Sequence, residues 1–304
     1  MSMRAQRIGA ATVHVVPEFS GNPMPLTVGM PEVAEADLRA ARAWLSDPNL
    51  GETPEESVLC LSWHTFVVHV AGKTVLIDTG LGNQKDRPDF IEFANGRTTD
   101  FFGALETAGV RPDEVDLVVC THLHFDHVGW NTRLTDAGWV PSFPNADYIF
   151  SRADFDHYRE EAQRHSVHTS AFDDSVLPVV NAGLATLIEP GHVLIDDGVT
   201  RLWLEGAAGH SPGSLLVRLH SIDSEAVFTG DLIHHPIQLV RPEINLSVEE
   251  QPEDAARTRI RLISELADSG SVVCPAHFSV FPMGRISREG NGYRWKRLGG
   301  DSNE

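Results

Sequence analysis

The chain has 304 residues, 41% hydrophobic and 22% charged, an ordinary composition for a globular protein with a substantial core. Its 24 basic and 43 acidic residues give a formal net charge of -19, and no basic patch stands out. Such a surface repels phosphate backbones and anionic lipids, so we expect no nucleic-acid or membrane partner.

Three cysteines, Cys60, Cys120 and Cys274, lie in apolar runs. An odd number in such positions argues against a disulfide framework and for a reducing compartment. No apolar run reaches the length of a membrane span, and the N-terminal stretch lacks a convincing cleavage site. Together these features predict a cytoplasmic protein.

The first half of the chain predicts a strand, turn, helix, strand order typical of α/β layers. β-branched, partly alternating runs predict strands at 8–16, 58–70 and 74–78. A threonine N-cap with a closing glycine predicts a helix at 98–109. Residues 20–57 include Pro23, Pro25, Pro31 and Pro54 around a helix at 35–45, and we interpret them as a loop-rich excursion. A buried strand is predicted at 115–120 and another at the end of 138–150.

Residues 151–185 have a polar, helical pattern that contains His157, His165 and His168. We expect these histidines on a solvated helix face, with the lining of a pocket as the alternative. Later strands are predicted at 193–195, 200–206, 214–219, 226–231 and 271–277, and a helix at 252–269. No low-complexity linker interrupts the chain, so residues 1–304 are predicted to form a single domain with an excursion at 20–57 and an insertion at 151–185.

The stretch THLHFDHVGW, residues 121–130, places His122, His124, Asp126 and His127 within six positions. If the segment is extended, the first three side chains point the same way and His127 enters from the turn behind them. Buried imidazoles and a carboxylate without a cation would lack partners, at a cost in free energy. The density of these residues therefore predicts a metal site rather than core packing.

Three more ligand-type residues end later apolar or small-residue runs: His210 in GHSPGS, Asp231 in FTGD and His277 in CPAH. Strand ends at a common sheet edge are where α/β folds place their chemistry. We therefore expect seven candidate ligands to meet at one place.

These residues resemble the metallo-β-lactamase superfamily, whose hallmark is H-x-H-x-D-H followed by a histidine, an aspartate and a histidine. The strand-ending Asp78-Thr79-Gly80 and Pro275-Ala276-His277 fit the same family, and the match runs from about residue 65 to 278. The chain looks most similar to the branch of N-acyl homoserine lactonases and methyl parathion hydrolase. The resemblance implies an α/β fold built as a four-layer αββα sandwich.

The resemblance also implies one zinc ion held by His122, His124 and His210, a second by Asp126, His127 and His277, and Asp231 as the bridge. Imidazole and carboxylate ligands suit zinc, and manganese, iron or cobalt also suit a set without cysteine.

In the family's mechanism, two cations about 3.5 to 4 Å apart share a hydroxide that attacks the substrate. Asp126 then passes a proton to the leaving group. Asp78 would orient a ligating histidine, or would simply stabilise its turn.

Two positions depart from the family pattern. Where the lactonases have a tyrosine three residues after the bridging aspartate, this chain has His234, followed by His235. His234 is predicted to donate a hydrogen bond to the substrate carbonyl, or else to pack near the rim. Trp130 replaces a second glycine and is predicted to pack beneath the site. Other aromatic residues near the motifs are expected in the core, with a pocket wall as the alternative: Trp63, His64, Phe66, Phe93, Phe101 and Phe102.

The sequence thus predicts a dinuclear metal-dependent hydrolase of a small-molecule lactone or related ester, acting through a metal-bridging hydroxide. An organophosphate triester or aryl ester is the alternative substrate. A mononuclear iron oxidoreductase of the same fold would use fewer of the seven ligands, and a diiron flavoprotein would need a flavin domain after residue 278. RNA-processing nucleases carry basic surfaces, and a non-catalytic binding module would have a degraded ligand set. The excursion and the insertion are candidates for homodimer contacts or a pocket lid.

Overall fold

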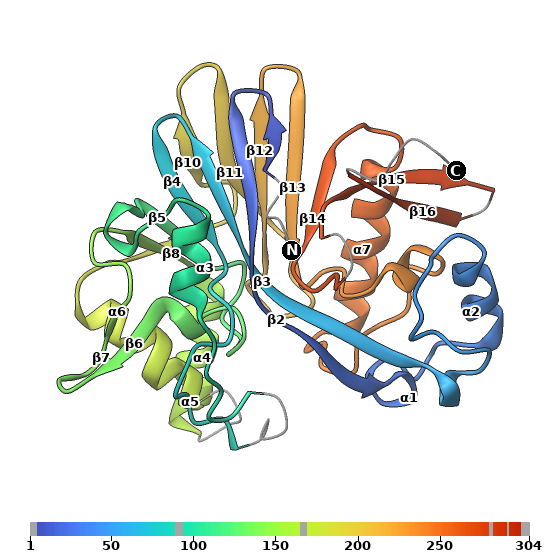
Figure 1. The fold of residues 1–304 in the computed structure, drawn as a ribbon, viewed down its shortest axis with the longest axis horizontal. Coiled ribbons are helices and arrows are strands. Elements are labelled where there is room, and N and C mark those ends of the chain that lie inside the picture. Colours follow the sequence, from blue (N-terminus) through green and yellow to red (C-terminus); the bar gives the residue numbers. More distant parts are fainter. Residues whose placement is uncertain (1–4, 89–93, 165–168, 280–281, 291, 299–304) are drawn as a thin grey trace.

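The computed structural model describes residues 5–88, 94–164, 169–279, 282–290 and 292–298, in which two seven-stranded sheets pack face to face (Figure 1). The first sheet has the strand order β1 (Gln6–Ile8), β2 (Ala11–Pro25), β3 (Val58–Val70), β4 (Lys73–Ile77), β5 (Leu117–Val119), β8 (Asp147–Ser151) and β9 (Ala185–Ile188). The second has the order β10 (Val193–Asp196), β11 (Thr200–Gly206), β12 (Leu215–Ser221), β13 (Ser224–Gly230), β14 (Val272–Pro275), β15 (Gly284–Glu289) and β16 (Gly292–Arg297). A small hairpin pairs β6 (Thr132–Thr135) with β7 (Gly138–Pro141).

Helices cover the outer face of each sheet (Figure 1). Over the first sheet lie α3 (Phe101–Thr107), α4 (Arg152–Gln163), α5 (Thr169–Ala171), a π-helical turn (Phe172–Val176) and α6 (Leu177–Asn181). The amphipathic α7 (Pro252–Leu266) packs on the second sheet through Leu262, Ile263 and Leu266. The short helices α1 (Leu26–Gly29) and α2 (Glu35–Arg42) lie beside the N-terminal end of β3. The predicted four-layer αββα sandwich is confirmed.

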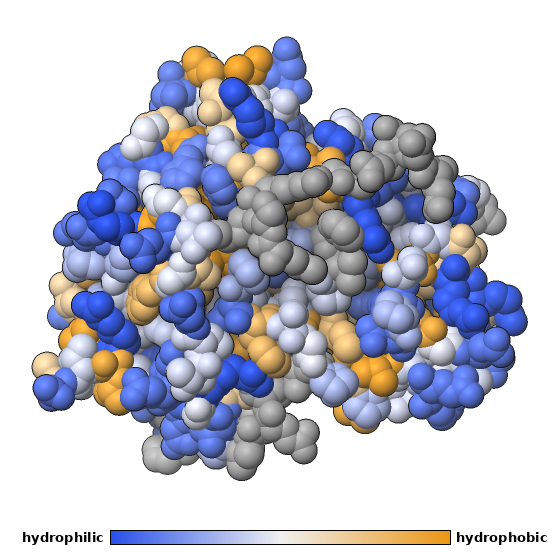
Figure 2. Space-filling view, in the orientation of Figure 1, coloured by the Kyte–Doolittle hydropathy of each residue, from blue (hydrophilic) through white to orange (hydrophobic). Residues whose placement is uncertain are grey.

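The inner core forms where the apolar faces of the two sheets meet. Phe66 of β3 meets Phe228 of β13 edge to face, with 5.2 Å between the ring centroids. On the face shown in Figure 2, hydrophilic residues are spread widely and hydrophobic residues form scattered groups. In the described part of the chain, no helix combines the length and the apolar character needed to cross a membrane.

Two parallel strand pairs position the predicted ligands. β4 pairs in parallel with β5 in the first sheet, and β13 pairs in parallel with β14 in the second. Parallel strands present their carboxyl ends at the same sheet edge, where open α/β sheets bind ligands. Asp78 and the histidine cluster follow β4 and β5, and Asp231 and His277 follow β13 and β14.

The structure corrects several predicted elements. The strand predicted at 8–16 is interrupted by a two-residue turn that contains Gly9, whose φ of +58° suits the left-handed region. Residues 20–25 of the predicted excursion belong to β2. Among the described residues this part of β2 pairs with β3 alone, and such an edge tolerates prolines. The N-cap of α3 is Asp100, which accepts from the backbone N–H of Gly103 at 3.2 Å, and not a threonine.

Strands β9, β15 and β16 lay outside the predicted elements. The polar, half-exposed residues of the β15–β16 hairpin lack the apolar alternation by which a strand is recognised. The organisation of residues 1–304 as a single domain stays a prediction.

Candidate metal centre

The histidine cluster lies on a loop that begins after Val119. Contrary to the prediction of an extended segment, residues 121–127 turn tightly, and the backbone N–H of His127 donates to the carbonyl of His124 at 3.1 Å. The side chains converge because the loop folds around one point: the ring centroids of His122 lie 4.5 Å from those of His124 and 4.0 Å from those of His127.

A glycine permits this loop to lie against the turn that follows β4. The carbonyl of Gly80 accepts from the backbone N–H of Gly129 at 2.8 Å, and the carbonyl of Thr79 accepts from that of Trp130 at 2.9 Å. A Cβ at Gly129 would lie 2.0 Å from the backbone carbon of Leu81, so no larger residue fits at this position. The two ligand-bearing turns are therefore held together as one unit.

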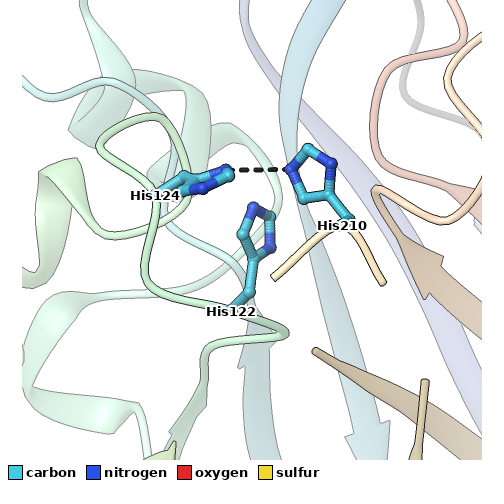
Figure 3. A group of neighbouring side chains, drawn as sticks. All are labelled: His122, His124 and His210. Carbon is cyan, nitrogen blue, oxygen red and sulfur yellow. Dashed lines mark hydrogen bonds between the residues drawn. The ribbon is translucent and has the colours of Figure 1, made fainter. Parts of the chain in front are cut away.

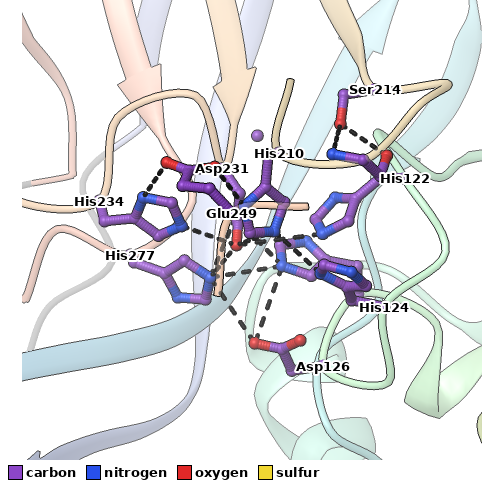
Figure 4. A network of polar contacts seen from close by, with 12 residues as sticks. His122, His124, Asp126, His210, Ser214, Asp231, His234, Glu249 and His277 are labelled. Atoms are coloured by element: carbon purple, nitrogen blue, oxygen red, sulfur yellow. Dashed lines mark hydrogen bonds and ion pairs between the residues drawn. The ribbon is translucent and has the colours of Figure 1, made fainter. Parts of the chain in front are cut away.

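All seven predicted ligands meet at this edge. The ligand atoms of His122, His124 and His210 lie within 4.8 Å of one another (Figure 3). The same holds for the group of Asp126, His127 and His277. Asp231 lies between the two groups, with Oδ2 3.3 Å from His210 Nε2 and Oδ1 3.1 Å from His127 Nε2 (Figure 4).

Every ligand histidine uses its other ring nitrogen for a hydrogen bond directed away from the centre. The five pairs are His122 Nδ1 with Thr121 Oγ1 at 3.2 Å, His124 Nε2 with Glu250 Oε1 at 3.1 Å, His127 Nδ1 with Asp78 Oδ2 at 2.9 Å, His210 Nδ1 with Glu249 Oε2 at 3.0 Å, and His277 Nδ1 with the Ser62 carbonyl at 2.9 Å. Such partners fix the tautomer and the ring orientation of metal-binding histidines.

Two inward-facing atoms lack hydrogen-bond partners among the described residues. His122 Nε2 has none there, and Asp231 Oδ1, although close to two imidazoles, is in hydrogen-bond geometry with neither. Leaving buried polar atoms unpaired is costly, and a cation removes that cost. The residues therefore fit a divalent metal centre, with imidazole and carboxylate as the ligands.

The electrostatics of the site agree with this assignment. Burial, together with the neighbouring His127 and His124, lowers the pKa of His122 well below its ordinary value, which keeps the ring neutral as metal binding requires. Burial would raise the pKa of Asp231, but the surrounding imidazoles of His127 and His277 hold it well below its usual range. Asp231 is therefore a carboxylate, the form that binds cations.

Asp78 joins the strand end to the cluster. Its carboxylate accepts from the Thr121 backbone N–H at 2.7 Å and the Thr121 hydroxyl at 2.9 Å, besides the contact with His127. Its φ of +55° is unfavourable for a residue with a Cβ, and such strain is typical of positions that the surroundings fix for function. The predicted contact of Asp78 with a ligand histidine is present.

Trp63 contacts the centre directly. Its indole N–H donates to Asp126 Oδ2 at 2.8 Å, and its ring meets His277 edge to face at 5.7 Å. The side chain of Asp126 is 12% exposed, the largest value among the seven ligands, so it is the ligand most open to solvent. The sequence placed Trp63 near the site but contained no sign of this hydrogen bond.

His234 is fully buried rather than at the rim. Its Nε2 lies 3.2 Å from Asp231 Oδ2, and its ring stacks on that of His277 with 5.8 Å between centroids. Its neighbour His235 points the other way and contacts Asp47 at 3.1 Å, which ties this loop to the segment after α2. The prediction that His234 donates to a substrate carbonyl is not tested by these contacts.

The remaining aromatic residues lie in the core as expected. Trp130 is buried against Phe101 and Phe102 and donates to Glu18 at 2.7 Å. His64 is buried and bonded to Ser62 and the Pro275 carbonyl, and Phe66 belongs to the inter-sheet core. Phe93, His165 and His168 lie outside the described residues.

Three charged or polar neighbours of the centre had no signal in the sequence. Glu249 and Glu250 contact His210 and His124, and Tyr158 donates to Glu250. His157, predicted on a solvated face, is one-third exposed and lies 3.0 Å from Glu250. No spacing rule links residues this far apart along the chain.

The chain is similar to proteins of known family. The model of the metallo-beta-lactamase superfamily matches residues 59–277. The acyl-coenzyme A thioesterases MBLAC2 of Bos taurus and Homo sapiens are each 29% identical over 245 residues, which cover 75% of this chain and 77% of theirs.

Two solved structures share the fold over nearly the whole chain. AidC, described as a dizinc quorum-quenching lactonase, is 17% identical, with a TM-score of 0.75 and coverage of 99% of this chain and 98% of its own. The hydrolase AbOPH is 20% identical, with a TM-score of 0.78 and the same coverage. The chain therefore belongs to the metallo-beta-lactamase superfamily and is a metal-dependent hydrolase.

Proposed function

We propose that this protein is a dinuclear metal hydrolase that opens lactones or cleaves related carboxylic esters and thioesters. The observation that carries the proposal is the convergence of five imidazoles and two carboxylates at one sheet edge, each imidazole held from behind by a hydrogen bond. His122, His124 and His210 would hold one ion, Asp126, His127 and His277 the other, and Asp231 both. Zinc suits this set, since every ligand is an imidazole or a carboxylate, and manganese, iron or cobalt are the alternatives.

Divalent ions in such a site lower the pKa of water towards neutrality and polarise a substrate carbonyl. The protein's own contribution to proton transfer falls to Asp126. Trp63 holds Asp126 Oδ2 at 2.8 Å, and the partial exposure of the side chain leaves the carboxylate within reach of a leaving group. Asp126 can therefore take the proton that the attacking water gives up and pass it to the departing oxygen or sulfur.

The role of His234 also belongs to this proposal. Because its ring is buried beside Asp231, we propose that it first orients that carboxylate. Donation to substrate remains a second role for the same nitrogen.

Two similarities support an acyl substrate. AidC, whose fold this chain shares, is described as a lactonase, and the MBLAC2 proteins, which are similar over three-quarters of the chain, are acyl-coenzyme A thioesterases. Lactones and thioesters present the same electrophile, a carbonyl carbon with an oxygen or sulfur leaving group. The thioester is therefore the second candidate substrate.

A substrate panel tests the proposal. Zinc-loaded protein is assayed against acyl homoserine lactones and simple lactones, acyl-coenzyme A thioesters and phosphate triesters, and the bound metal is measured per chain. We expect two divalent ions and turnover of a lactone or thioester, abolished by Asp231→Ala. Turnover of phosphate triesters alone, or full activity of the Asp231→Ala variant, would contradict the proposal.

A further inference from the structure

Two adjacent glutamates lie behind the group of His122, His124 and His210. Glu249 Oε2 lies 3.0 Å from His210 Nδ1, and Glu250 Oε1 lies 3.1 Å from His124 Nε2. The nitrogens on the other side of these two rings, His210 Nε2 and His124 Nδ1, face each other at 2.8 Å (Figure 3).

The backbone fixes the glutamates in register with the loop that carries His210. The Glu250 N–H donates to the His210 carbonyl at 3.2 Å, and the Gln251 N–H donates to the Gly209 carbonyl at 2.8 Å. Helix α7 starts at the next residue, Pro252, and anchors the segment to the second sheet. These backbone hydrogen bonds hold the glutamates beside the His210 loop, and the contact of Glu249 with the His210 ring is buried.

Each glutamate is itself held by further partners. Arg259 of α7 is fully buried and donates to Glu249 Oε1 at 2.7 Å. Glu250 accepts from Tyr158 of α4 and lies 3.0 Å from His157 of the same helix. Glu249 is thus held by α7, which packs on the second sheet, and Glu250 is held by α4, which covers the first sheet.

We infer that Glu249 and Glu250 are paired positioning residues that set the affinity of one ion, the one held by His122, His124 and His210. Two of that ion's three imidazoles have a carboxylate partner in this dipeptide. The other ion has a different arrangement: His127 is held by Asp78, and His277 by a backbone carbonyl. Carboxylate partners orient the ring and raise its basicity, and losing one lowers metal affinity by about 10- to 100-fold. The inference rests on the dinuclear centre proposed above.

Stepwise metal affinities test it. The full chain is stripped of metal, and zinc or cobalt binding is titrated against a competing chelator for the wild type, Glu249→Gln, Glu250→Gln and the control Glu253→Gln. Glu253 lies in the first turn of α7 with a side chain that is 92% exposed. We expect each of the first two variants to weaken one binding step by about 10- to 100-fold and leave the other step unchanged, with an altered cobalt absorption spectrum. The control should match the wild type in both steps.

The outcomes separate this inference from the proposed function. A wild type that binds fewer than two divalent ions contradicts the dinuclear centre itself. If the wild type binds two ions and the Glu250→Gln variant binds both as tightly as the wild type does, the inference is overturned but the dinuclear centre stands. The same holds if the variant weakens both binding steps equally. Glu250 is partly exposed, so its variant keeps the test decisive even where Glu249→Gln, which leaves Arg259 without its carboxylate, fails to fold.

Discussion

Arg259 provides a stability test of the network behind the metal centre. Its side chain is fully buried, and it donates to Glu249 Oε1 at 2.7 Å and to the carbonyls of Leu232 and Ile244 at 2.7 and 2.6 Å. Replacement by methionine keeps much of the volume but leaves a buried carboxylate without its cation. Breaking a buried pair in this way costs about 3–5 kcal/mol. We therefore expect Arg259→Met to lower the free energy of unfolding by that amount.

The assay is urea unfolding of metal-free protein in excess chelator, so that metal binding does not contribute to the measured free energy. The matched control is Arg257→Met on the same helix, whose side chain is 67% exposed and pairs with Glu253 and Asp254. Exposed pairs contribute about 0–1 kcal/mol.

Adding Glu249→Gln to Arg259→Met removes the stranded charge and should restore part of the lost stability. An Arg259→Met variant within about 1 kcal/mol of the Arg257→Met control would refute the reasoning, as would a double variant less stable than either single one.

Three further tests address the site and the fold. Trp63→Phe removes the hydrogen bond to Asp126 but keeps an aromatic ring, so kcat should fall about 10-fold or more at unchanged thermal stability; an unchanged kcat would show that the bond is dispensable. Burial, together with the charge of Arg87, lowers the pKa of Lys85 from 10.5 to about 7. Between these two pH values the unfolded chain binds one more proton at Lys85 than the folded chain does, so the free energy of unfolding rises with pH. Unfolding free energies of wild type and Lys85→Met across this range should therefore differ in slope by up to about 1.4 kcal/mol per pH unit, and parallel curves would exclude the shift. Removal of metal by a chelator should abolish hydrolysis and added zinc, manganese or cobalt should restore it, whereas activity in protein shown to be metal-free by elemental analysis would contradict a metal mechanism.

The Glu249–Glu250 dipeptide and the Asp78 turn divide the support of the centre between the two sheets. Asp78 follows a strand of the first sheet and holds His127, while the glutamates precede the helix of the second sheet and hold His210 and His124. A change in the packing of one sheet on the other would therefore move His127 relative to His210 and His124.

The sequence by itself indicated the type of chemistry and most of the strands, and its resemblance to a known family implied the four layers. Seven ligand-type residues stand at the ends of apolar runs, and ligand identity and apolar alternation are local properties that single residues and short segments carry. For the same reason the strand at 58–70 is predicted with its observed bounds. The extended form of the histidine cluster was wrong, because the loop's shape depends on Gly129 packing against the turn after β4.

Only the tertiary structure decided what surrounds the ligands. Trp63 meets Asp126, and Glu250 meets His124, across 63 and 126 positions of the chain. Such contacts leave no periodic or compositional trace, since they arise from how two sheets pack. The depth of His234 likewise follows from the loop after β13 folding behind Asp231. The ligands can thus be recognised from local pattern, whereas the groups that orient them are fixed by long-range packing.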